Sequence, residues 1–137
     1  MPDNSVLAQF TSKLAPAETP PETAGDPVDD FGAYGWLRGV RERSLMLELR
    51  KKDGGVIALG YAWLERIEFD PSEGITLKFA GQVVKITGRN LNAELRPNVR
   101  LLAGLVRHRV PWIQEADEPT LLTSQGRDVV IERIALA

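Results

Sequence analysis

The sequence contains no cysteine and only one histidine, His108, among its 137 residues. The absence of cysteine excludes disulfide bonds, thiolate metal ligands and cysteine nucleophiles. With a single imidazole, a metal site would have to rely on carboxylates, which favour Mg²⁺ or Ca²⁺ over transition metals. A chain without cysteine is typical of a reducing compartment, and we therefore expect a cytoplasmic protein.

Long hydrophobic runs are also absent from the sequence. A membrane-spanning helix needs about 18 or more consecutive apolar residues, and no such run occurs. Residues 1–16 lack the basic segment and the apolar core of a secretory signal. We expect a protein that has no membrane partner.

Motifs that carry chemistry are missing as well. The sequence holds no nucleophile elbow, zinc-protease, P-loop or dinucleotide-binding pattern. His108 lies between Arg107 and Arg109, and the sequence locates no carboxylate that would orient it as a general base. Glu65 and Glu68 do not form a glycosidase pair, because their odd separation along a strand directs them to opposite faces. We predict no enzyme activity, no catalytic site, no metal site and no cofactor.

Charge is distributed unevenly, although the net charge is only -2. Residues 1–30 hold six acidic side chains against one lysine, whereas residues 31–137 hold 16 basic side chains against 13 acidic ones. Four of the nine prolines lie within residues 15–30, where Val28 is the only large aliphatic residue. Such a segment buries too little apolar area to offset its ordering entropy. We interpret residues 1–30 as an acidic, extended tail and residues 31–137 as a single globular domain.

A short amphipathic segment precedes the proline-rich part of the tail. Its large hydrophobic side chains fall at helical spacing and belong to Val6, Leu7, Phe10 and Leu14. Asn4 or Ser5 would cap a short helix over residues 5–14. We predict that this segment docks on a partner or on the body of the same chain. The alternative is a frayed terminus that carries these hydrophobic residues by chance.

Apolar residues alternate from residue 34 onward, and this period of two predicts strands. Leu45, Leu47 and Leu49 form the first alternating set, and Asp53-Gly54 then predicts a type I′ hairpin turn, in which both central residues have positive φ. Residues 56–70 continue as one long strand with a bend or bulge at Gly60. Further strands are predicted around residues 75–79, 84–86 and 129–136.

A helical period follows the first four strands. Apolar residues recur at intervals of three and four, which predicts a helix over residues 92–107 that Pro111 ends. Residues 117–127 have the composition of a loop. The predicted fold is mainly β, a β-rich α+β domain. Its curved antiparallel meander of five or six strands closes into a small barrel or roll, with one helix after the fourth or fifth strand.

Basic residues of the predicted helix form one candidate binding face. A helix would place Arg96, Arg100 and Arg107 within about 40° of one another, because their offsets are near whole turns. Arginine binds phosphate in a fork geometry, and an exposed tryptophan stacks on bases. The full polyanion site would consist of Arg96, Arg100, Arg107, His108, Arg109 and Trp112. The alternative is a solvated helix face with ordinary ion pairs and a core Trp112, because the body is only mildly basic.

The long strand 56–70 favours protein binding. Val56 and Ala58 lie on the parity opposite Ile57 and Trp63, so both faces of the strand are partly apolar. Oligomerisation is a common way to cover a sheet edge, although the predicted helix would also be able to cover the second face. We predict a non-enzymatic interaction or scaffold domain that self-assembles or binds a protein partner. Binding of RNA or single-stranded DNA is the alternative function.

Overall fold

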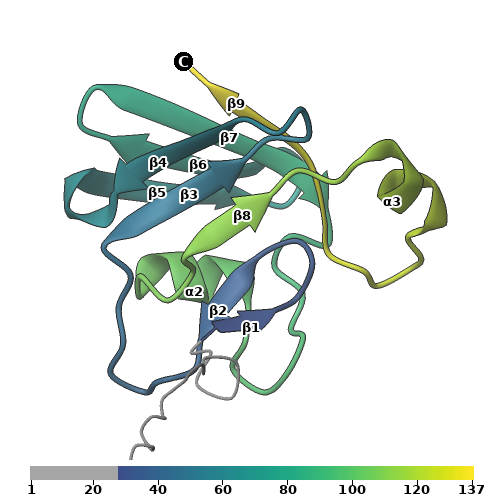
Figure 1. Ribbon diagram of the computed structural model, residues 1–137, viewed down its shortest axis with the longest axis horizontal. Helices are drawn as coiled ribbons and strands as arrows, with labels where there is room; N and C mark the ends of the chain where they lie inside the picture. Colours follow the sequence, from purple (N-terminus) through teal and green to yellow (C-terminus); the bar gives the residue numbers. More distant parts are fainter. Residues whose placement is uncertain (1–27) are drawn as a thin grey trace, which may run out of the picture.

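The computed structural model describes residues 28–137, which form a mainly β domain with two short helices (Figure 1). The strands are β1 (Val28–Asp30), β2 (Gly35–Leu37), β3 (Met46–Arg50), β4 (Val56–Gly60), β5 (Leu64–Asp70), β6 (Gly74–Phe79), β7 (Gln82–Arg89), β8 (Trp112–Gln114) and β9 (Val130–Leu136). The helices are the 3-10 turn η1 (Tyr61–Trp63), α2 (Leu101–Val106) and α3 (Glu118–Thr123). The predicted docking residues Val6, Leu7, Phe10 and Leu14 lie outside the described residues.

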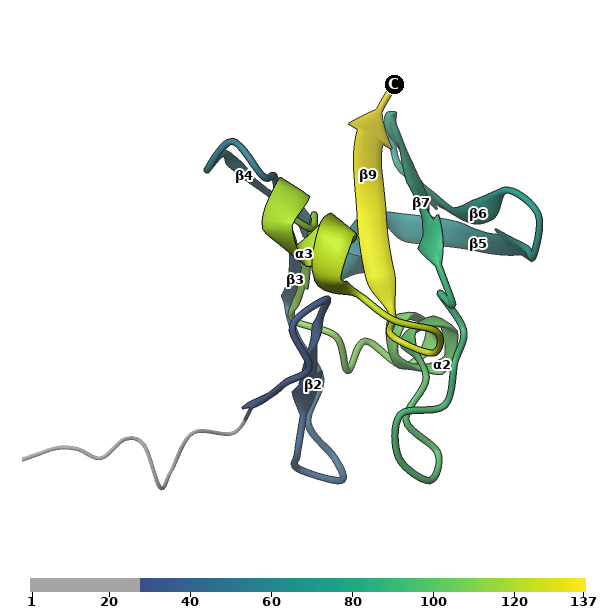
Figure 2. The same cartoon turned by 90° about the vertical axis from the view of Figure 1, so that its right-hand side faces the viewer.

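Two sheets pack face to face. One has the order β4-β3-β8 and the other the order β5-β6-β7-β9, while β1 and β2 form a separate ribbon. Figure 2 shows the two sheets as layers, with α2 across the opening at one end of the space between them. Neighbouring strands are antiparallel except β3 and β8, which run parallel. Strand β1 contains the last three residues that the sequence assigned to the tail.

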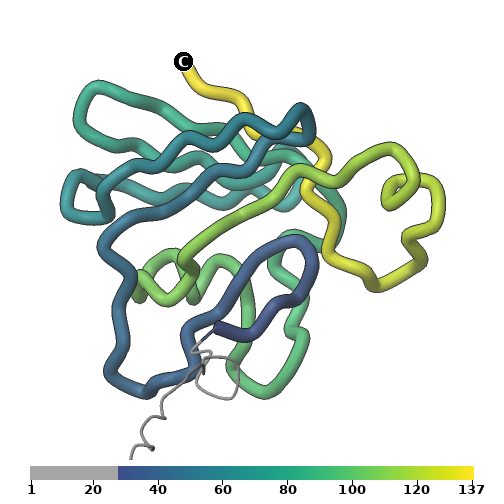
Figure 3. The backbone as a smooth tube through the Cα atoms, viewed as in Figure 1, coloured from purple at the N-terminus to yellow at the C-terminus, as the bar shows by residue number. Residues whose placement is uncertain are grey.

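A single bent segment of chain joins the two layers. Strand β4 ends at Gly60, η1 turns the chain, and β5 begins at Leu64 in the other sheet (Figure 3). The predicted bend in the long strand is therefore confirmed. Gly60 leaves room for Trp63, because a Cβ atom at this position would lie 3.0 Å from Cδ1 of Trp63.

The predicted closed barrel is wrong. Strand β8 pairs with β3 and strand β9 pairs with β7, so no strand pairing joins β8 to β9 among the described residues. Side chains bridge this seam instead: Ile134 N donates to Glu115 Oε2 at 2.7 Å, and Lys51 Nζ donates to Ile134 O at 2.5 Å. One backbone bond, from Ala116 N to Ile131 O at 2.8 Å, completes it. These bonds occupy the N–H and C=O groups of Ile134 and the C=O group of Ile131, which would otherwise require partners at the seam.

The predicted helix over residues 92–107 is also wrong in length. Helix α2 contains only Leu101–Val106, and a bridge between Arg96 and Val99 closes a tight turn ahead of it. Asn98 has φ of 67° in that turn, a conformation that a right-handed helix does not contain. Helix α2 follows the seventh strand rather than the predicted fourth or fifth. The count differs because the ribbon β1–β2 was not predicted and because the predicted long strand forms two strands, β4 and β5.

Helix α3 occupies the region that was predicted to be a loop. Its first turn contains Pro119, whose fixed φ suits a helix start. The carboxylate of Asp117 caps it by accepting a hydrogen bond from Thr120 N at 2.9 Å. Hydrogen bonds from the side chain and the backbone of Thr120 favour the charged carboxylate and lower the pKa of Asp117.

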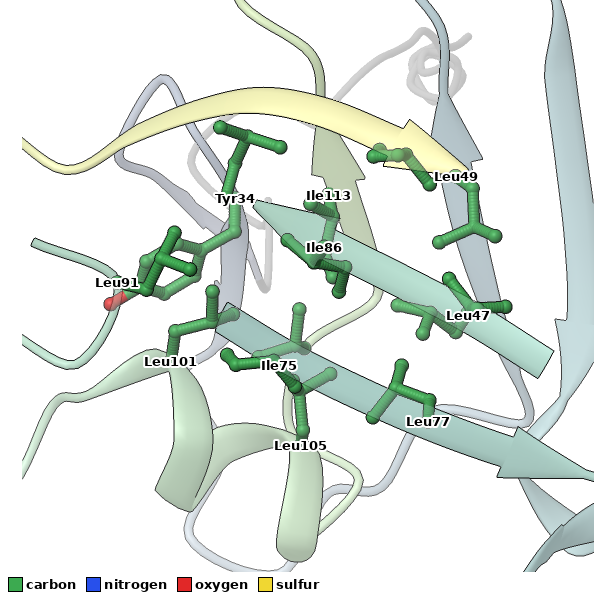
Figure 4. Packing of buried hydrophobic residues seen from close by; sticks show 14 of the residues in the cluster. Tyr34, Leu47, Leu49, Ile75, Leu77, Ile86, Leu91, Leu101, Leu105 and Ile113 are labelled. Carbon is green, nitrogen blue, oxygen red and sulfur yellow. The ribbon is translucent and has the colours of Figure 1, made fainter. Parts of the chain in front are cut away.

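The core lies between the two sheets and is closed by α2 (Figure 4). Strand β3 contributes Leu47 and Leu49, and α2 contributes Leu101 and Leu105, all fully buried. The predicted alternation is confirmed for these strand residues but not for Leu45, which is 87% exposed because β3 begins one residue later. The hairpin at Asp53-Gly54 is confirmed, but its turn is not type I′, since only Gly54 has positive φ.

Candidate interaction surface

Strand β4 is the outer strand of its sheet, so one of its sides has no strand partner among residues 28–137. On its other side, Tyr61 N donates to Leu45 O at 3.0 Å and Lys51 N donates to Gly55 O at 2.8 Å. Bonded residues alternate along an antiparallel pair, so the odd-numbered residues of β4 bond to β3. The residues whose backbone N–H and C=O groups face the open side are Val56, Ala58 and Gly60.

The chemistry of β4 differs from that of the other outer strands. Strand β4 has no charged residue, whereas β5 has four in seven residues and β9 has two in seven. The remaining outer strand, β8, is covered by a bridge between Tyr34 and Ile113 and by a hydrogen bond from Gln114 N to Ala33 O. Charge and coverage are the usual protections of a sheet edge, and β4 has neither within the described chain.

Apolar side chains surround the open side of β4. Val56 is 57% exposed and Trp63 is 64% exposed. On the outer face of Gly60, the position of a Cβ atom would lie 3.0 Å from Trp63 Cδ1 and 3.8 Å from Met46 Sδ. We call Val56–Gly60, together with Met46 and Trp63, the β4 edge. It combines unpaired backbone groups with exposed apolar area, which is unusual for the surface of a monomer.

Buried aromatic contacts fix the bend that carries Trp63. The hydroxyl of Tyr61 donates to Val110 O at 2.6 Å, and its ring stacks on His108 with centroids 4.4 Å apart. Burial raises the pKa of Tyr61, so the hydroxyl remains a donor. Trp63 O accepts a hydrogen bond from Ala80 N at 2.9 Å, which ties η1 to the other sheet. Trp63 is thus exposed on a rigid support.

The two fully packed tyrosines give a matched test of this anchoring. We expect Tyr61→Phe to lower the free energy of unfolding by about 1–2 kcal/mol, because Val110 O loses its donor. Tyr34→Phe is expected to change it by less than about 0.5 kcal/mol or to raise it, since the buried Tyr34 hydroxyl has no hydrogen-bond partner in residues 28–137. Urea unfolding at 25 °C measures both, and equal losses would contradict the assignment.

The helical face that was predicted to carry the polyanion residues does not form, because α2 begins only at Leu101. Arg96 donates to Asp29 at 2.6 Å and its guanidinium lies 5.0 Å from the ring centre of Phe31. Hydrogen bonds from Arg38 and from Arg96 hold the pKa of Asp29 below its usual value. Arg100 lies 3.6 Å from a carboxylate oxygen of Glu94. Both arginines precede α2, so they share no helical face with Arg107.

The remaining members of that set have structural contacts of their own. Arg109 donates to Leu37 O and to Gly39 O, the latter at 2.8 Å, and so holds the loop after β2. Trp112 is buried, with the Arg50 guanidinium 4.4 Å from its ring centre. His108 is half-buried against Tyr61. Among the six predicted polyanion residues, only Arg107 has an exposed side chain that contacts no charged or polar partner in the described chain.

A cleft of about 940 Å³ lies between the β3–β4 hairpin, α3 and the start of β9. Most of the charged side chains that line it already contact other groups of the chain, since Lys51 lies 3.5 Å from Glu115 and Asp117 caps α3. Asp128 accepts a hydrogen bond from Gln125 N at 2.9 Å. The cleft therefore presents no group of side chains that selects one class of ligand.

No family model, curated protein or solved structure matches this chain. Neither helix in residues 28–137 has the length and apolarity to cross a bilayer. The β4 edge was only partly visible in the sequence. Residues 54–64 contain no charge, and this signal is local, but the outer position of β4 follows from the pairing of β3 with β8.

Proposed function

We propose that this domain is a non-enzymatic protein-interaction module that adds an extended strand of a protein partner to β4. The observation that carries the proposal is the β4 edge, an uncharged outer strand whose backbone groups at Val56, Ala58 and Gly60 face solvent. In strand addition, backbone hydrogen bonds supply affinity, and alternate side chains supply specificity. The absence of cysteine fits a cytoplasmic location for this interaction.

Both faces of β4 offer contacts to the side chains of an added strand. Ile57 and Leu59 lie on the same face as the buried Leu47 and Leu49, and they remain partly exposed at the rim of the core. The opposite face carries Val56, with Trp63 beyond it. A strand with alternating apolar residues would therefore bury area on both sides.

Polyanion binding is the weaker function for this domain. Arg96, Arg100 and Arg109 are engaged by acidic groups or carbonyls of the same chain. A phosphate would have to displace those partners before it gained a contact. An exposed Arg107 alone gives neither a stripe of charge nor a stacking platform.

Selection of ten-residue peptides from a random library against the full chain tests the proposal. We expect the selected peptides to alternate apolar and polar residues and to perturb the amide resonances of Val56, Ala58 and Gly60. Ala58→Pro should weaken binding at least about tenfold, because proline removes an N–H that faces the open edge while the bonds to β3 remain. A variant on α3, Leu122→Ala, is the control and should bind normally.

Two results would contradict this function. Peptides that bind the cleft beside α3 and tolerate Ala58→Pro would move the interaction away from β4. Failure to select any peptide, combined with binding of single-stranded RNA that weakens steeply with salt, would favour the polyanion alternative.

A further inference from the structure

We propose that the strand added to β4 is β4 of a second copy of this chain, in an antiparallel dimer whose two-fold axis passes beside Ala58. The inference rests on the proposed function and names its partner. Two-fold dimers bring the same patch of both subunits together, so the patch must be complementary to itself. The β4 edge meets this requirement in its backbone and its side chains, and the strand carries no charge that would repel a second copy.

The backbone fixes the register of such a pair. Only Val56, Ala58 and Gly60 offer bonding groups on the open side. An antiparallel arrangement uses all three when Ala58 faces the partner's Ala58 and Val56 faces the partner's Gly60. Each facing pair of this kind exchanges two hydrogen bonds, which gives about six across the interface. A shift by two residues leaves one of the three without a facing partner on β4.

The side chains fit the same register. Val56 faces a residue without a side chain, and Trp63 lies over that glycine within its own copy. Val56 would therefore pack against the partner's Trp63, and the symmetric contact would form at the other end. On the inner face, Ile57 lies next to the partner's Leu59. These two partly exposed side chains, one at the edge of each core, would pack against each other. Ala58 at the axis is small enough that two copies approach without a clash.

Charge does not oppose this pairing. Strand β4 carries no charged residue, so two copies that meet along it bring no like charges opposite one another.

Sedimentation equilibrium of the full chain, from about 1 to 300 μM, tests the dimer. Residue 58 faces itself across the axis, so Ala58→Lys and Ala58→Glu each place like charges opposite one another. Each variant alone should raise the dissociation constant roughly fivefold or more. An equimolar mixture of the two should restore dimers, because lysine then faces glutamate. Leu122→Lys on α3 is the matched charge control and should dimerise normally.

Rescue in the mixture supports this register, and it excludes misfolding as the cause of the loss. Emission of Trp63 should shift to shorter wavelength on dimerisation, and Trp63→Phe removes that shift. A wild-type chain that stays monomeric to 300 μM, a dimer that tolerates both charges, or a mixture that fails to associate overturns the inference. If selected peptides still bind β4 in a monomeric chain, the proposed function stands and only the second copy is rejected.

Discussion

Replacing Glu115 by alanine is expected to lower the free energy of unfolding by about 3 kcal/mol and the melting temperature by about 10 °C. Glu115 is 4% exposed and is the buried charged residue of the described chain. Its oxygens accept from Ile134 N at 2.7 Å and Lys52 N at 3.0 Å, and Lys51 Nζ lies 3.5 Å away. Alanine would leave two backbone donors without their acceptor and would remove the carboxylate that faces the Lys51 ammonium group. Thermal and urea unfolding at pH 7 measure the loss.

A second glutamate on β9 provides the matched control. Glu132 pairs with Arg89 at 2.9 Å, but both side chains are more than 40% exposed. Glu132→Ala is therefore expected to cost less than about 1 kcal/mol. If the two substitutions had equal effects, the buried contacts of Glu115 would not be what seals the seam between the sheets.

The contribution of Glu115 also depends on pH. Burial alone would raise its pKa, but hydrogen bonds from Ile134 N and Lys52 N, together with the charge of Lys51, hold it below the usual 4.5. Such a group stabilises the fold fully above its unfolded pKa, and the contribution is lost as the pH falls through the folded value. The difference in stability between wild type and Glu115→Gln should be constant above about pH 5.5 and should shrink below about pH 4.5. A difference that persists unchanged at pH 3 would contradict this account.

Gly104→Ala is expected to destabilise the domain by about 1–2 kcal/mol, although alanine is the better helix former. The added Cβ would lie 2.6 Å from Trp36 Cζ3 and 2.6 Å from Val110 Cγ2. Both neighbours are buried, so neither can move aside without disturbing the core. Overpacking of this kind costs more than the gain of about 1 kcal/mol in helix propensity. Urea unfolding at 25 °C measures the net effect.

Gly126 is the matched control for this substitution. A Cβ atom at Gly126 would have no neighbour within 4 Å. Gly126→Ala should therefore leave stability unchanged or raise it by up to about 1 kcal/mol, since alanine restricts the unfolded chain. A stabilising Gly104→Ala would show that α2 sits further from Trp36 than the packing described above.

Local patterns were sufficient to predict the central strands. Ile75 and Leu77 in β6 and Val84 and Ile86 in β7 alternate with residues that are more exposed, and all four are fully buried. Alternation is set by neighbouring residues on one strand, so the sequence shows it directly. The bend after Gly60 was also predictable locally, because a glycine within an unusually long apolar strand pattern indicates a bend or bulge.

The helical pattern over residues 92–107 misled for a physical reason. Leu91 and Val99 are buried, but they reach the core from turns rather than from a helix. A loop that returns to the core every few residues produces the same spacing as an amphipathic helix. The start of α3 was accessible in principle, since Asp117 and Pro119 are the residues expected at a helix N-terminus.

The open seam and the outer position of β4 were not accessible from local pattern. Glu115 meets Ile134 across 19 positions of sequence, and β8 joins β3 across more than 60. These contacts depend on how the layers stack, and no period in the sequence encodes them. Arg96 and Arg109 share the same difficulty, because their contacts with Asp29 and the Leu37 carbonyl connect separate elements.

The uncharged β4 edge has a consequence for the chain before assembly. A short, apolar, β-branched segment without proline or charge resembles the segments that nucleate aggregates. Natural proteins flank or interrupt such segments with gatekeeper residues. Val56–Gly60 contains none, and the nearest charged residues along the chain are Asp53 and Glu65. During synthesis in a crowded cell, a newly made copy would meet the same strand on its neighbours. Rapid capture of this strand in a defined complex would therefore protect solubility as well as serve function.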